Sequence, residues 1–473
     1  MHFAGYTPGE WLLLAQYELL LFASLFFLIG AIDELAIDLL WLRLKRSGRI
    51  VTASLQPAGN ATDRPRPLSG PAAVFLPAWQ EDAVIGTTVR HMLEAWPQGD
   101  WTLYCGCYPN DPLTIASASG SSSGDPRVRV VVHSVPGPTT KADCLNRLYR
   151  ALEEDERRHG RRYRMVLLHD AEDMVDPAAL PMLDSAIDQA DFVQLPVLPV
   201  VHPRSRWIAG HYCDEFAEAH GKAMPLRDAI GAGLPSAGVG CAIAREQLAL
   251  LSAARGDGLP FDAGSLTEDY QLGLSIRRLG GRTRFLRVRH ADGRLVATRA
   301  YFPGRLDEAV RQKTRWLHGI AFQGWERLGW SRSVAECWMR MRDRRGPFSA
   351  LVLATAYLLV LLGALSLGLA ATGMAPAIES SPLLTALLAV NFASLLWRAV
   401  MRAGFTAREY GWREGLRSVL RIPVANIISI MAGRRAVIAY VGSLAGGQVR
   451  WDKTEHRDHP VNPVQTVGQG PPA

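Results

Sequence analysis

The sequence predicts an α/β domain with a mainly parallel, Rossmann-like sheet, joined to several transmembrane helices. In the middle of the chain, short β-rich runs alternate with helical stretches, which is typical of parallel βαβ units. Apolar runs long enough to cross a bilayer lie on both sides of this region. The 473 residues are 48% hydrophobic and 21% charged, and these values exclude both a single small domain and a disordered chain.

The first element, within 1–46, is a transmembrane helix over about 11–32. This apolar stretch has the roughly 20 residues that a bilayer requires. No Lys or Arg precedes it, whereas Arg43, Lys45 and Arg46 follow it. The positive-inside rule therefore places the N-terminus outside and residue 43 in the cytoplasm. A secretory signal would begin with a basic segment and end at a small-residue cleavage site, and the sequence has neither.

Two more transmembrane helices are expected within 348–402. They lie at about 348–372 and 382–397, and both are apolar over enough residues to cross a bilayer. A basic juxtamembrane segment, 331–347, precedes the first of them, and the loop between them carries no Lys or Arg. The charge pattern therefore places this loop on the same side of the membrane as the N-terminus.

The region at 403–454 is expected to form interfacial amphipathic helices. Its apolar stretch, 421–446, is interrupted by Arg434 and Arg435. This interruption favours a helix that lies in the membrane interface over a fourth span. The tail at 455–473 is rich in Pro, Gly and His, and we expect it to be disordered.

Between the first two spans, a linker at 47–71 leads into a domain at 72–330. The domain contains five β-rich runs, at 72–77, 101–105, 128–132, 164–169 and 191–200. Helical stretches such as 82–96 and 141–157 separate several of them. Ligands of parallel sheets bind beyond the carboxyl ends of the strands, so the residues that follow each run are the candidates for a site.

Acidic side chains follow three of these runs. Glu81 follows the first run, Asp111 the second, and Asp170 and Glu172 the run at 164–169. Carboxylates gathered at one edge of a sheet repel one another unless a cation or a polar substrate lies between them. Mg²⁺ or Mn²⁺ bound to a diphosphate would satisfy this requirement, because these ions take hard oxygen ligands. At each single position, a turn or helix-cap residue is the alternative.

A second acidic segment precedes a helical run at 271–279. Ser265 and Glu268 have the spacing of a capping box. On that interpretation, Asp269 is only a favourable charge near a helix N-terminus.

A later helical stretch, 306–319, carries a polar and aromatic face. Gln312, Arg315 and Trp316 lie on this face because residues three and four positions apart are neighbours on a helix. The alternative interpretation is a Trp and Arg anchor at the membrane surface.

The order of these pieces resembles that of family 2 glycosyltransferases, especially the membrane-embedded processive synthases of the cellulose and hyaluronan type. In chain order the pieces are Glu81, Asp111, Asp170-Ala171-Glu172, Thr267-Glu268-Asp269 and Gln312-Lys313-Thr314-Arg315-Trp316. The resemblance covers about 72–330, and the flanking spans fit the same membrane architecture. It implies a GT-A-like fold and a metal-dependent, inverting transfer of a sugar.

Four strings look most similar to the glycosyltransferases of the bacteriophage adsorption protein B type. They are CYPNDP at 107–112, HDAEDMVDP at 169–177, SLTEDYQLGL at 265–274 and WDKTEH at 451–456. Members of that group are bacterial inner-membrane proteins, and some carry a C-terminal cyclic-di-GMP-binding module linked to exopolysaccharide production. This chain ends soon after 451–456, so we expect such a module to be absent. Any regulation is then expected to come from a partner.

The resemblance assigns roles on the donor side. Glu81 and Asp111 match positions that hold the uridine and ribose, where carboxylates accept hydrogen bonds. Lys141 resembles a lysine that offers a point charge to the nucleotide, with a solvated lysine at a helix start as the alternative. Asp170 and Glu172 match the acidic pair that binds the metal ion and the diphosphate. Glu172 departs from the usual aspartate by one methylene.

The resemblance also assigns roles on the acceptor side. Asp269, within the Thr267-Glu268-Asp269 triplet, matches the general base that takes the proton of the acceptor hydroxyl. Gln312, Arg315 and Trp316 match the segment in which arginine pairs with diphosphate and tryptophan packs against the acceptor sugar. Gly240 and Cys241 belong to the segment Gly238-Val239-Gly240-Cys241, which resembles the small-residue loop at the acceptor site, with a plain tight turn as the alternative.

Taken together, the resemblance implies a multi-pass protein of the bacterial inner membrane with a periplasmic N-terminus and a cytoplasmic catalytic domain. The expected donor is a UDP-sugar, such as a UDP-N-acetylhexosamine, and the expected acceptor is a growing exported or surface polysaccharide. A single-addition transferase that acts on a lipid-linked acceptor is the first alternative. Because three spans are too few for a complete translocation channel, we expect a homodimer or an outer-membrane export partner.

Other classes of protein fit less well. A non-catalytic membrane scaffold or phage-entry factor is the rival from a different class, because Glu172 departs from the pattern. A nucleotidyltransferase would need neither the 312–316 segment nor the spans. The chain has no P-loop motif, and its basic clusters are juxtamembrane, so no nucleic-acid partner is expected. The six Cys show no zinc spacing and no disulfide-scaffold density, and we interpret them as reduced thiols.

Overall fold

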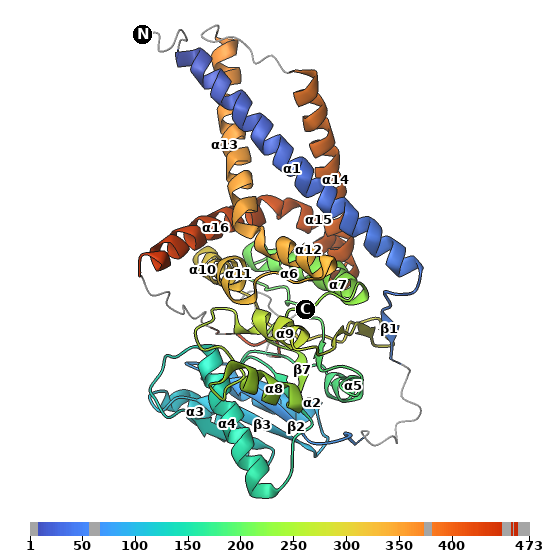
Figure 1. The fold of residues 1–473 in the computed structure, drawn as a ribbon, viewed down its shortest axis with the longest axis vertical. Helices are drawn as coiled ribbons and strands as arrows, with labels where there is room; N and C mark the ends of the chain where they lie inside the picture. The colour runs from blue at the N-terminus through green and yellow to red at the C-terminus, as the bar shows by residue number, and fades with distance from the viewer. Residues whose placement is uncertain (1–7, 56–66, 373–380, 447–455, 457, 462–473) are drawn as a thin grey trace, which may run out of the picture.

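The computed structural model describes residues 8–55, 67–372, 381–446, 456 and 458–461. Figure 1 shows an α/β domain at one end of the molecule and long helices that extend away from it at the other end. The loop predicted at 373–381 and the tail predicted to be disordered lie mostly outside the described residues.

The centre of the α/β domain is a seven-stranded sheet in the described part of the chain. The strands are β2 (Ala72–Pro77), β3 (Trp101–Cys107), β4 (Val128–Val132), β5 (Met165–Leu168), β6 (Phe192–Gln194), β7 (Cys241–Ala244) and β8 (Thr283–Phe285). Their order is β4-β3-β2-β5-β7-β6-β8. All neighbouring strands pair in parallel except β7, which is antiparallel to β5 and β6. The mainly parallel sheet predicted from the sequence is confirmed.

The sequences of the central strands are continuous apolar runs because helices cover both faces of the sheet. Val74 and Leu76 of β2 pack towards α2 (Ile85–Ala95), and the alternate residue Phe75 packs towards α4 (Lys141–His159). The other helices of the domain are α3 (Pro112–Ser121), α5 (Ala179–Ala186), α6 (Ile208–Glu218), α7 (Met224–Ala229), α8 (Arg245–Arg255), α9 (Glu268–Arg278), α10 (Leu306–Leu317) and α11 (Gly324–Leu328). Two π-helical segments, η1 (Ala219–Ala223) and η2 (His318–Gln323), follow α6 and α10.

Two local expectations differ from the structure. The run predicted as a strand at 191–200 forms only the short strand β6, because Pro196 and Pro199 lack the backbone N–H that would continue a ladder. The capping box is also absent, since α9 begins at Glu268 with Thr267 as its N-cap, and the Ser265 hydroxyl instead accepts a hydrogen bond from the Thr267 N–H at 3.2 Å.

In the part of the chain that the structure describes, four helices are long and apolar enough to cross a membrane, by length and composition: α1 (Pro8–Arg46), α13 (Gly346–Ala371), α14 (Pro382–Tyr410) and α16 (Ile422–Leu444). In Figure 1, α1, α13 and α14 extend away from the α/β domain, whereas α15 (Trp412–Leu420) and α16 lie across the boundary between the two parts. The helix α12 (Val334–Arg344) lies close to this boundary, and a short pairing of β1 (Ala53–Ser54) with β9 (Val288–Arg289) follows α1.

The helix α16 joins the membrane region to the α/β domain. Its buried face includes Ile428, which packs in one cluster with Tyr212 of α6 and Val310 of α10. The opposite face exposes Ile438 and Val441 to the surroundings. One side of α16 therefore covers the helix α10, on which three of the predicted site residues lie.

Candidate active site

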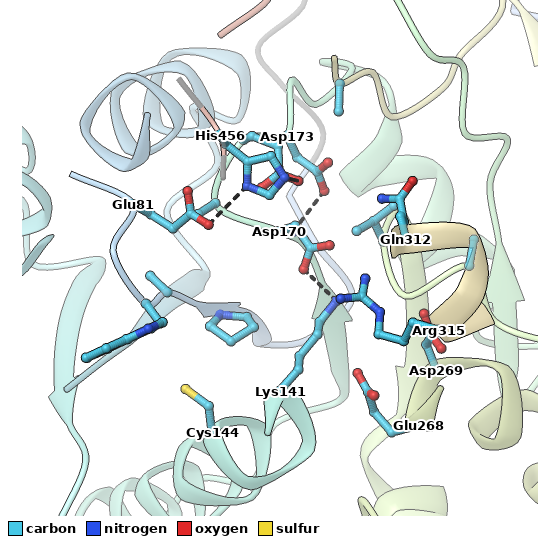
Figure 2. A pocket seen from close by; sticks show the side chains of 18 of the residues that line it. Glu81, Lys141, Cys144, Asp170, Asp173, Glu268, Asp269, Gln312, Arg315 and His456 are labelled. Atoms are coloured by element: carbon cyan, nitrogen blue, oxygen red, sulfur yellow. Dashed lines mark hydrogen bonds and ion pairs between the residues drawn. The ribbon is translucent and has the colours of Figure 1, made fainter. Parts of the chain in front are cut away.

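A single pocket gathers most of the predicted site residues. It lies where β2 and β5 end, where α4 and α9 begin, and beside the C-terminal half of α10 (Figure 2). Its lining includes the following predicted residues: Glu81, Lys141, Asp170, Glu172, Thr267, Glu268, Asp269, Gln312, Arg315 and Trp316. Three predicted residues, Asp111, Gly240 and Cys241, are not among the residues that line it.

Asp111 lies behind the pocket and supports Glu81. Its carboxylate caps α3, where it accepts a hydrogen bond from the Thr114 N–H, and it also accepts one from the Gln80 N–H at 2.6 Å. Gln80 has a φ of 54°, and this left-handed conformation turns the chain sharply after β2. The next N–H, that of Glu81, donates to the Thr114 hydroxyl at 2.9 Å. The acidic residue after β3 therefore fixes the turn that presents Glu81.

Lys141 and Asp170 form an ion pair inside the pocket. Lys141 is the first residue of α4, and its Nζ lies 2.5 Å from Asp170 Oδ1 at the end of β5. Burial alone would lower the pKa of the Lys141 ammonium, but the charges of Asp170, Glu268 and Asp269 together raise that pKa above its ordinary value. Lys141 therefore stays positively charged among three carboxylates.

Glu172 approaches Glu81 and a residue from the end of the chain, His456. His456 Nδ1 lies 3.0 Å from Glu81 Oε1, and His456 Nε2 lies 3.2 Å from Glu172 Oε1. One potential ligand atom from each of these residues can be chosen so that all three lie within 4.8 Å of one another. Two carboxylates and an imidazole are donors that suit Mn²⁺, and the carboxylates also suit Mg²⁺. Asp170, the other residue predicted as a ligand, is paired with Lys141 in this structure.

The pKa of Glu172 reflects the same crowding of negative charge. Burial and the nearby charge of Asp170 raise this pKa to about 8, against the lowering effect of His456. A cation beside Glu172 would therefore relieve an unfavourable burial of its carboxylate. By contrast, Asp173 already accepts hydrogen bonds from His169 Nδ1 at 2.9 Å and from the Asp170 N–H at 3.0 Å.

Two adjacent carboxylates, Glu268 and Asp269, begin α9 at the other side of the pocket. Burial and the charge of Asp269 raise the pKa of Glu268 to about 7, and burial also raises the pKa of Asp269 while Lys141 lowers it. Asp269 Oδ1 accepts a hydrogen bond from the Tyr270 N–H at 2.7 Å. Glu268 is the more deeply buried of the two, so Asp269 is the carboxylate that an acceptor could reach.

The helix α10 contributes Gln312, Arg315 and Trp316 to the lining. Figure 2 shows Gln312 and Arg315 on the side opposite Glu81. Gln312 Oε1 is buried and has no hydrogen-bond partner among the described residues. Such an atom costs stability unless a ligand or water satisfies it. Trp316 packs edge-on against Tyr212 at 6.1 Å between ring centroids, which gives the pocket an aromatic wall.

The loop before β7 approaches the pocket through only part of the predicted segment 238–241. Ala237 and Val239 line it, whereas Gly240 and Cys241 continue into the sheet, where Gly240 N–H donates to the Leu168 carbonyl at 3.0 Å. Gly238 has a φ of +77° and lies against Asp269. The predicted small-residue loop is therefore beside the pocket, and its residue Gly238 lies against Asp269.

Sequence reasoning gave no role to three further residues of the lining. Trp79 and Tyr108 directly follow β2 and β3, and their rings meet edge-on at 5.2 Å between centroids. Because residues that follow parallel strands are candidates for a site, their position in the sequence could have identified both as pocket residues. His456 lies in the string at 451–456, which supported the resemblance but whose side chains were not assigned to a site.

The fold and the pocket define a class of protein. A mainly parallel sheet, an acidic cluster with a lysine at its strand ends, and a carboxylate pair facing an Arg and Trp helix are features of glycosyltransferases with a GT-A-like fold. The model of the glycosyltransferase-like family 2 matches residues 70–319. The chain therefore belongs to glycosyltransferase family 2 and is a glycosyltransferase.

Curated relatives and solved structures are similar to this chain over much of its length. Bacteriophage adsorption protein B of Escherichia coli K12 and bacteriophage N4 adsorption protein B of Escherichia coli O157:H7 are each 34% identical to it over 451 residues. The match covers 90% of this chain, but the chain spans only 60% of the length of either relative.

Among solved structures, a mannosyltransferase from Pyrobaculum calidifontis in complex with GDP-Man and Mn²⁺ is 16% identical, with a TM-score of 0.49. That match covers 88% of this chain and 99% of the other. Glucosyl-3-phosphoglycerate synthase from Mycobacterium tuberculosis, in complex with Mn²⁺, UDP and phosphoglyceric acid, is 19% identical with a TM-score of 0.36, covering 60% of this chain and 88% of the other.

Proposed function

We propose that this protein is an inverting glycosyltransferase of the bacterial inner membrane that transfers a sugar from a UDP-sugar to a growing exported or surface polysaccharide. The observation that carries the proposal is the position of Asp269. Its carboxylate shares one pocket with the Lys141–Asp170 ion pair on one side and with Arg315 and Trp316 on the other. One site therefore combines a base, positive charges for a leaving diphosphate and an aromatic wall for a sugar.

The chemistry is a single displacement at the anomeric carbon. Asp269 accepts the proton of an acceptor hydroxyl as that oxygen attacks the anomeric carbon, and the bond from this carbon to the UDP oxygen breaks. The configuration at the anomeric carbon inverts because attack comes from the face opposite the leaving group. The fixed charges of Lys141 and Arg315 stabilise the negative charge that UDP gains, so no second carboxylic acid is needed.

The donor end of the pocket suits a nucleoside diphosphate. Trp79 and Tyr108 offer ring surfaces to a nucleobase, and the Tyr108 hydroxyl is held 2.6 Å from the Thr139 hydroxyl. Glu81 offers carboxylate oxygens to N–H or hydroxyl groups beside these rings. The identity of the base as uracil comes from the family resemblance.

A divalent cation, Mg²⁺ or Mn²⁺, would be held by Glu172 together with Glu81 and His456. When bound, such an ion supplies positive charge to the donor diphosphate. His456 would then be a ligand from the C-terminal tail, so the cation site would be complete only when His456 lies beside Glu172 and Glu81. We propose that Asp170, which the sequence predicts as a ligand, orients Lys141.

The acceptor is proposed to enter past Trp316. Phe216 and Phe302 lie beside this ring in the lining, with Phe216 6.4 Å from Trp316 between centroids. Aromatic side chains pack against the apolar faces of sugar rings, so this wall supports a glycan acceptor. A lipid-linked acceptor that receives one sugar would use the same wall, and product length separates the two.

The proposed topology has three spans, α1, α13 and α14, with α15 and α16 in the cytoplasmic interface. Arg421, which precedes α16, is bonded to Asp214 of α6 at 2.6 Å. His456, which follows α16, lies in the pocket beside Glu81. The start of α16 is thus tied to the α/β domain, and His456, a residue further along the chain, lies in a pocket of the same domain. Both observations support a helix that lies along the membrane surface and does not cross it.

The test is release of UDP by the purified full-length protein in detergent, with Mn²⁺ or Mg²⁺ and a panel of UDP-sugars. We expect turnover with one donor, which EDTA abolishes and which Asp269→Asn lowers by about 10²- to 10⁴-fold, as expected for the loss of a general base. Asp292→Asn, at an exposed position outside the pocket, is the matched control and should keep full activity. Product size then decides between a polymer and a single addition.

Failure has two distinguishable forms. A folded protein that binds no UDP and releases none with any donor would favour a non-catalytic membrane scaffold. A protein that binds UDP but turns over no donor would require a specific acceptor or an activating partner. Full activity in Asp269→Asn would refute the assignment of the base.

A further inference from the structure

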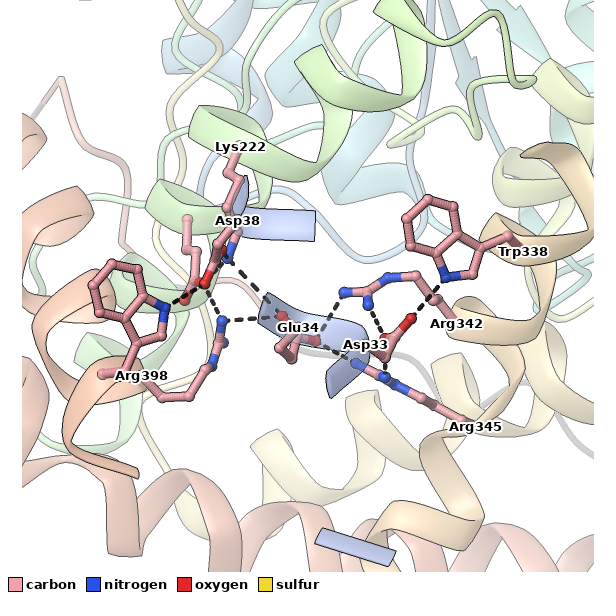
Figure 3. Close-up of polar contacts among 10 residues, drawn as sticks. Asp33, Glu34, Asp38, Lys222, Trp338, Arg342, Arg345 and Arg398 are labelled. Carbon is pink, nitrogen blue, oxygen red and sulfur yellow. Dashed lines mark hydrogen bonds and ion pairs between the residues drawn. The ribbon is translucent and has the colours of Figure 1, made fainter. Parts of the chain in front are cut away.

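The inner part of α1 carries acidic residues that are bonded to the helices around it. Figure 3 shows Asp33 and Glu34 facing Arg342 and Arg345 on one side, with Lys222 and Arg398 on the other. Because α1 has 39 residues and is about 58 Å long at 1.5 Å per residue, it extends well beyond a hydrocarbon core of about 30 Å. The acidic residues follow the apolar stretch, at the end of α1 nearest the α/β domain.

Asp33 is bonded to α12 and its C-cap residue. Among the described residues, its carboxylate is bonded by three side chains: Trp338 Nε1 at 2.7 Å, Arg345 at 2.5 Å and Arg342. Glu34 adds a second bond to Arg342 at 2.8 Å. The paired charges are mostly shielded from water, so each bond is screened less than a surface ion pair would be.

The same helix, α12, holds the first turn of α9. Asp343, next to Arg342 in sequence, accepts a hydrogen bond from the Tyr270 hydroxyl at 2.8 Å. The Arg227 guanidinium fixes the same carboxylate with two bonds of 3.0 and 2.9 Å, so Asp343 cannot turn away without breaking a buried pair. Tyr270 directly follows Asp269 and is only 5% exposed.

These contacts form a continuous chain from the membrane helix to the proposed base. We infer that Asp33 and Glu34 of α1 position Asp269 through α12, with Asp343 and Tyr270 as the last two contacts. None of these four residues touches the donor or acceptor in the proposed reaction, so they are positioning residues. The inference rests on the proposed role of Asp269, and it means that the catalytic carboxylate is placed correctly only while α1 is seated against α12.

Another aspartate on α1 provides a matched control. Asp38 is bonded to Lys222 of η1 at 2.5 Å and to Trp397 of α14 at 2.8 Å. Asp33→Asn therefore weakens the bonds of α1 to α12, whereas Asp38→Asn weakens its bonds to η1 and α14. Both substitutions remove one buried charge from the same helix, but only the first interrupts the chain of contacts that leads to Tyr270.

The experiment is hydrogen–deuterium exchange of the full-length protein in lipid nanodiscs, followed in peptides that cover 265–275. We expect Asp33→Asn to raise exchange there about tenfold, because the first turn of α9 opens locally more often. Asp38→Asn should leave the exchange rate of these peptides unchanged. Asp33→Glu, which keeps the negative charge, should show the wild-type exchange rate. An unchanged rate in Asp33→Asn, or an equal rise in Asp38→Asn, would overturn the inference.

A second variant keeps the test valid if Asp33→Asn does not fold. Tyr270→Phe removes one hydroxyl from a packed ring and should raise exchange in the same peptides; no rise would also overturn the inference. In UDP-release assays we expect both variants to lower kcat about tenfold with little change in KM for the donor, since small misplacements of a reacting group are costly. Exchange is read without any donor, so a failure of Asp269 as the base would not be confused with a failure of this contact chain.

Discussion

Gly238 lies so close to Asp269 that a Cβ atom on it would be 2.6 Å from Asp269 Oδ2. Its φ of +77° also lies in the left-handed region that side chains rarely adopt. The loop before β7 therefore sets the position of the proposed base from one side, as Tyr270 does from the other.

Gly238→Ala should consequently displace Asp269. We expect kcat for UDP release to fall about 100-fold, as a misplacement of about 1 Å can cause. Gly258→Ala is the matched control, because Gly258 has a φ of +73° and nothing within 4 Å of a Cβ. Both variants should lose about 1–2 kcal/mol of unfolding free energy through backbone strain. Equal activities of the two variants would contradict the proposed close contact.

Lys141 controls the charge of Asp269 and hence the pH dependence of the reaction. Activity needs the ionised carboxylate, so the rate rises with pH as Asp269 loses its proton. Burial raises the pKa of Asp269, and the positive charge of Lys141 lowers it. Lys141→Met removes the charge that lowers the pKa of Asp269. The acidic limb of the pH profile of kcat, measured at saturating donor, should therefore move to higher pH. Lys45→Met, at an exposed position on α1, should leave the limb in place, and a shift to lower pH in Lys141→Met would contradict the assignment.

The proposed cation site can be tested by metal affinity. Glu172→Gln and His456→Ala each remove one proposed ligand, and we expect the affinity for Mn²⁺, measured by electron paramagnetic resonance with UDP present, to fall at least about tenfold. His159→Ala, an exposed histidine at the end of α4, should have no effect. If neither substitution changes the affinity, the ion binds elsewhere, with Asp170 as the next ligand to replace.

The sheet and one half of the pocket could be predicted because they follow from local pattern. Apolar runs mark the parallel strands, and the carboxyl ends of such strands meet at one edge, so Glu81 and Asp170 were expected to be neighbours. For Asp111 the sequence left two roles open, because a carboxylate after a strand can face the pocket or cap a helix, and in the structure it caps α3.

The contact of His456 with Glu81 was beyond sequence reasoning for a different reason. The two residues are 375 positions apart, and no periodicity or spacing links a tail segment to a strand end. The ion pairs of Asp33 and Glu34 were also missed, since acidic residues after an apolar helix look like ordinary solvated charges. In both cases the partner is decided by tertiary packing.

The position of α16 gives the last prediction. A helix of 23 residues is long enough to cross a bilayer, yet Arg421 at one end is buried against Asp214, and His456 lies beyond the other end in the pocket. Only 11 residues lie between Leu444 and His456, and an extended segment that recrossed the bilayer would leave its backbone groups without hydrogen-bond partners. We therefore expect Leu444 to be on the cytoplasmic side. We expect a green fluorescent protein fused after residue 446 to fluoresce and alkaline phosphatase fused there to be inactive, whereas phosphatase fused after Ala371 should be active. Active phosphatase after residue 446 would show that α16 crosses the membrane and that His456 cannot reach Glu81 in the cell.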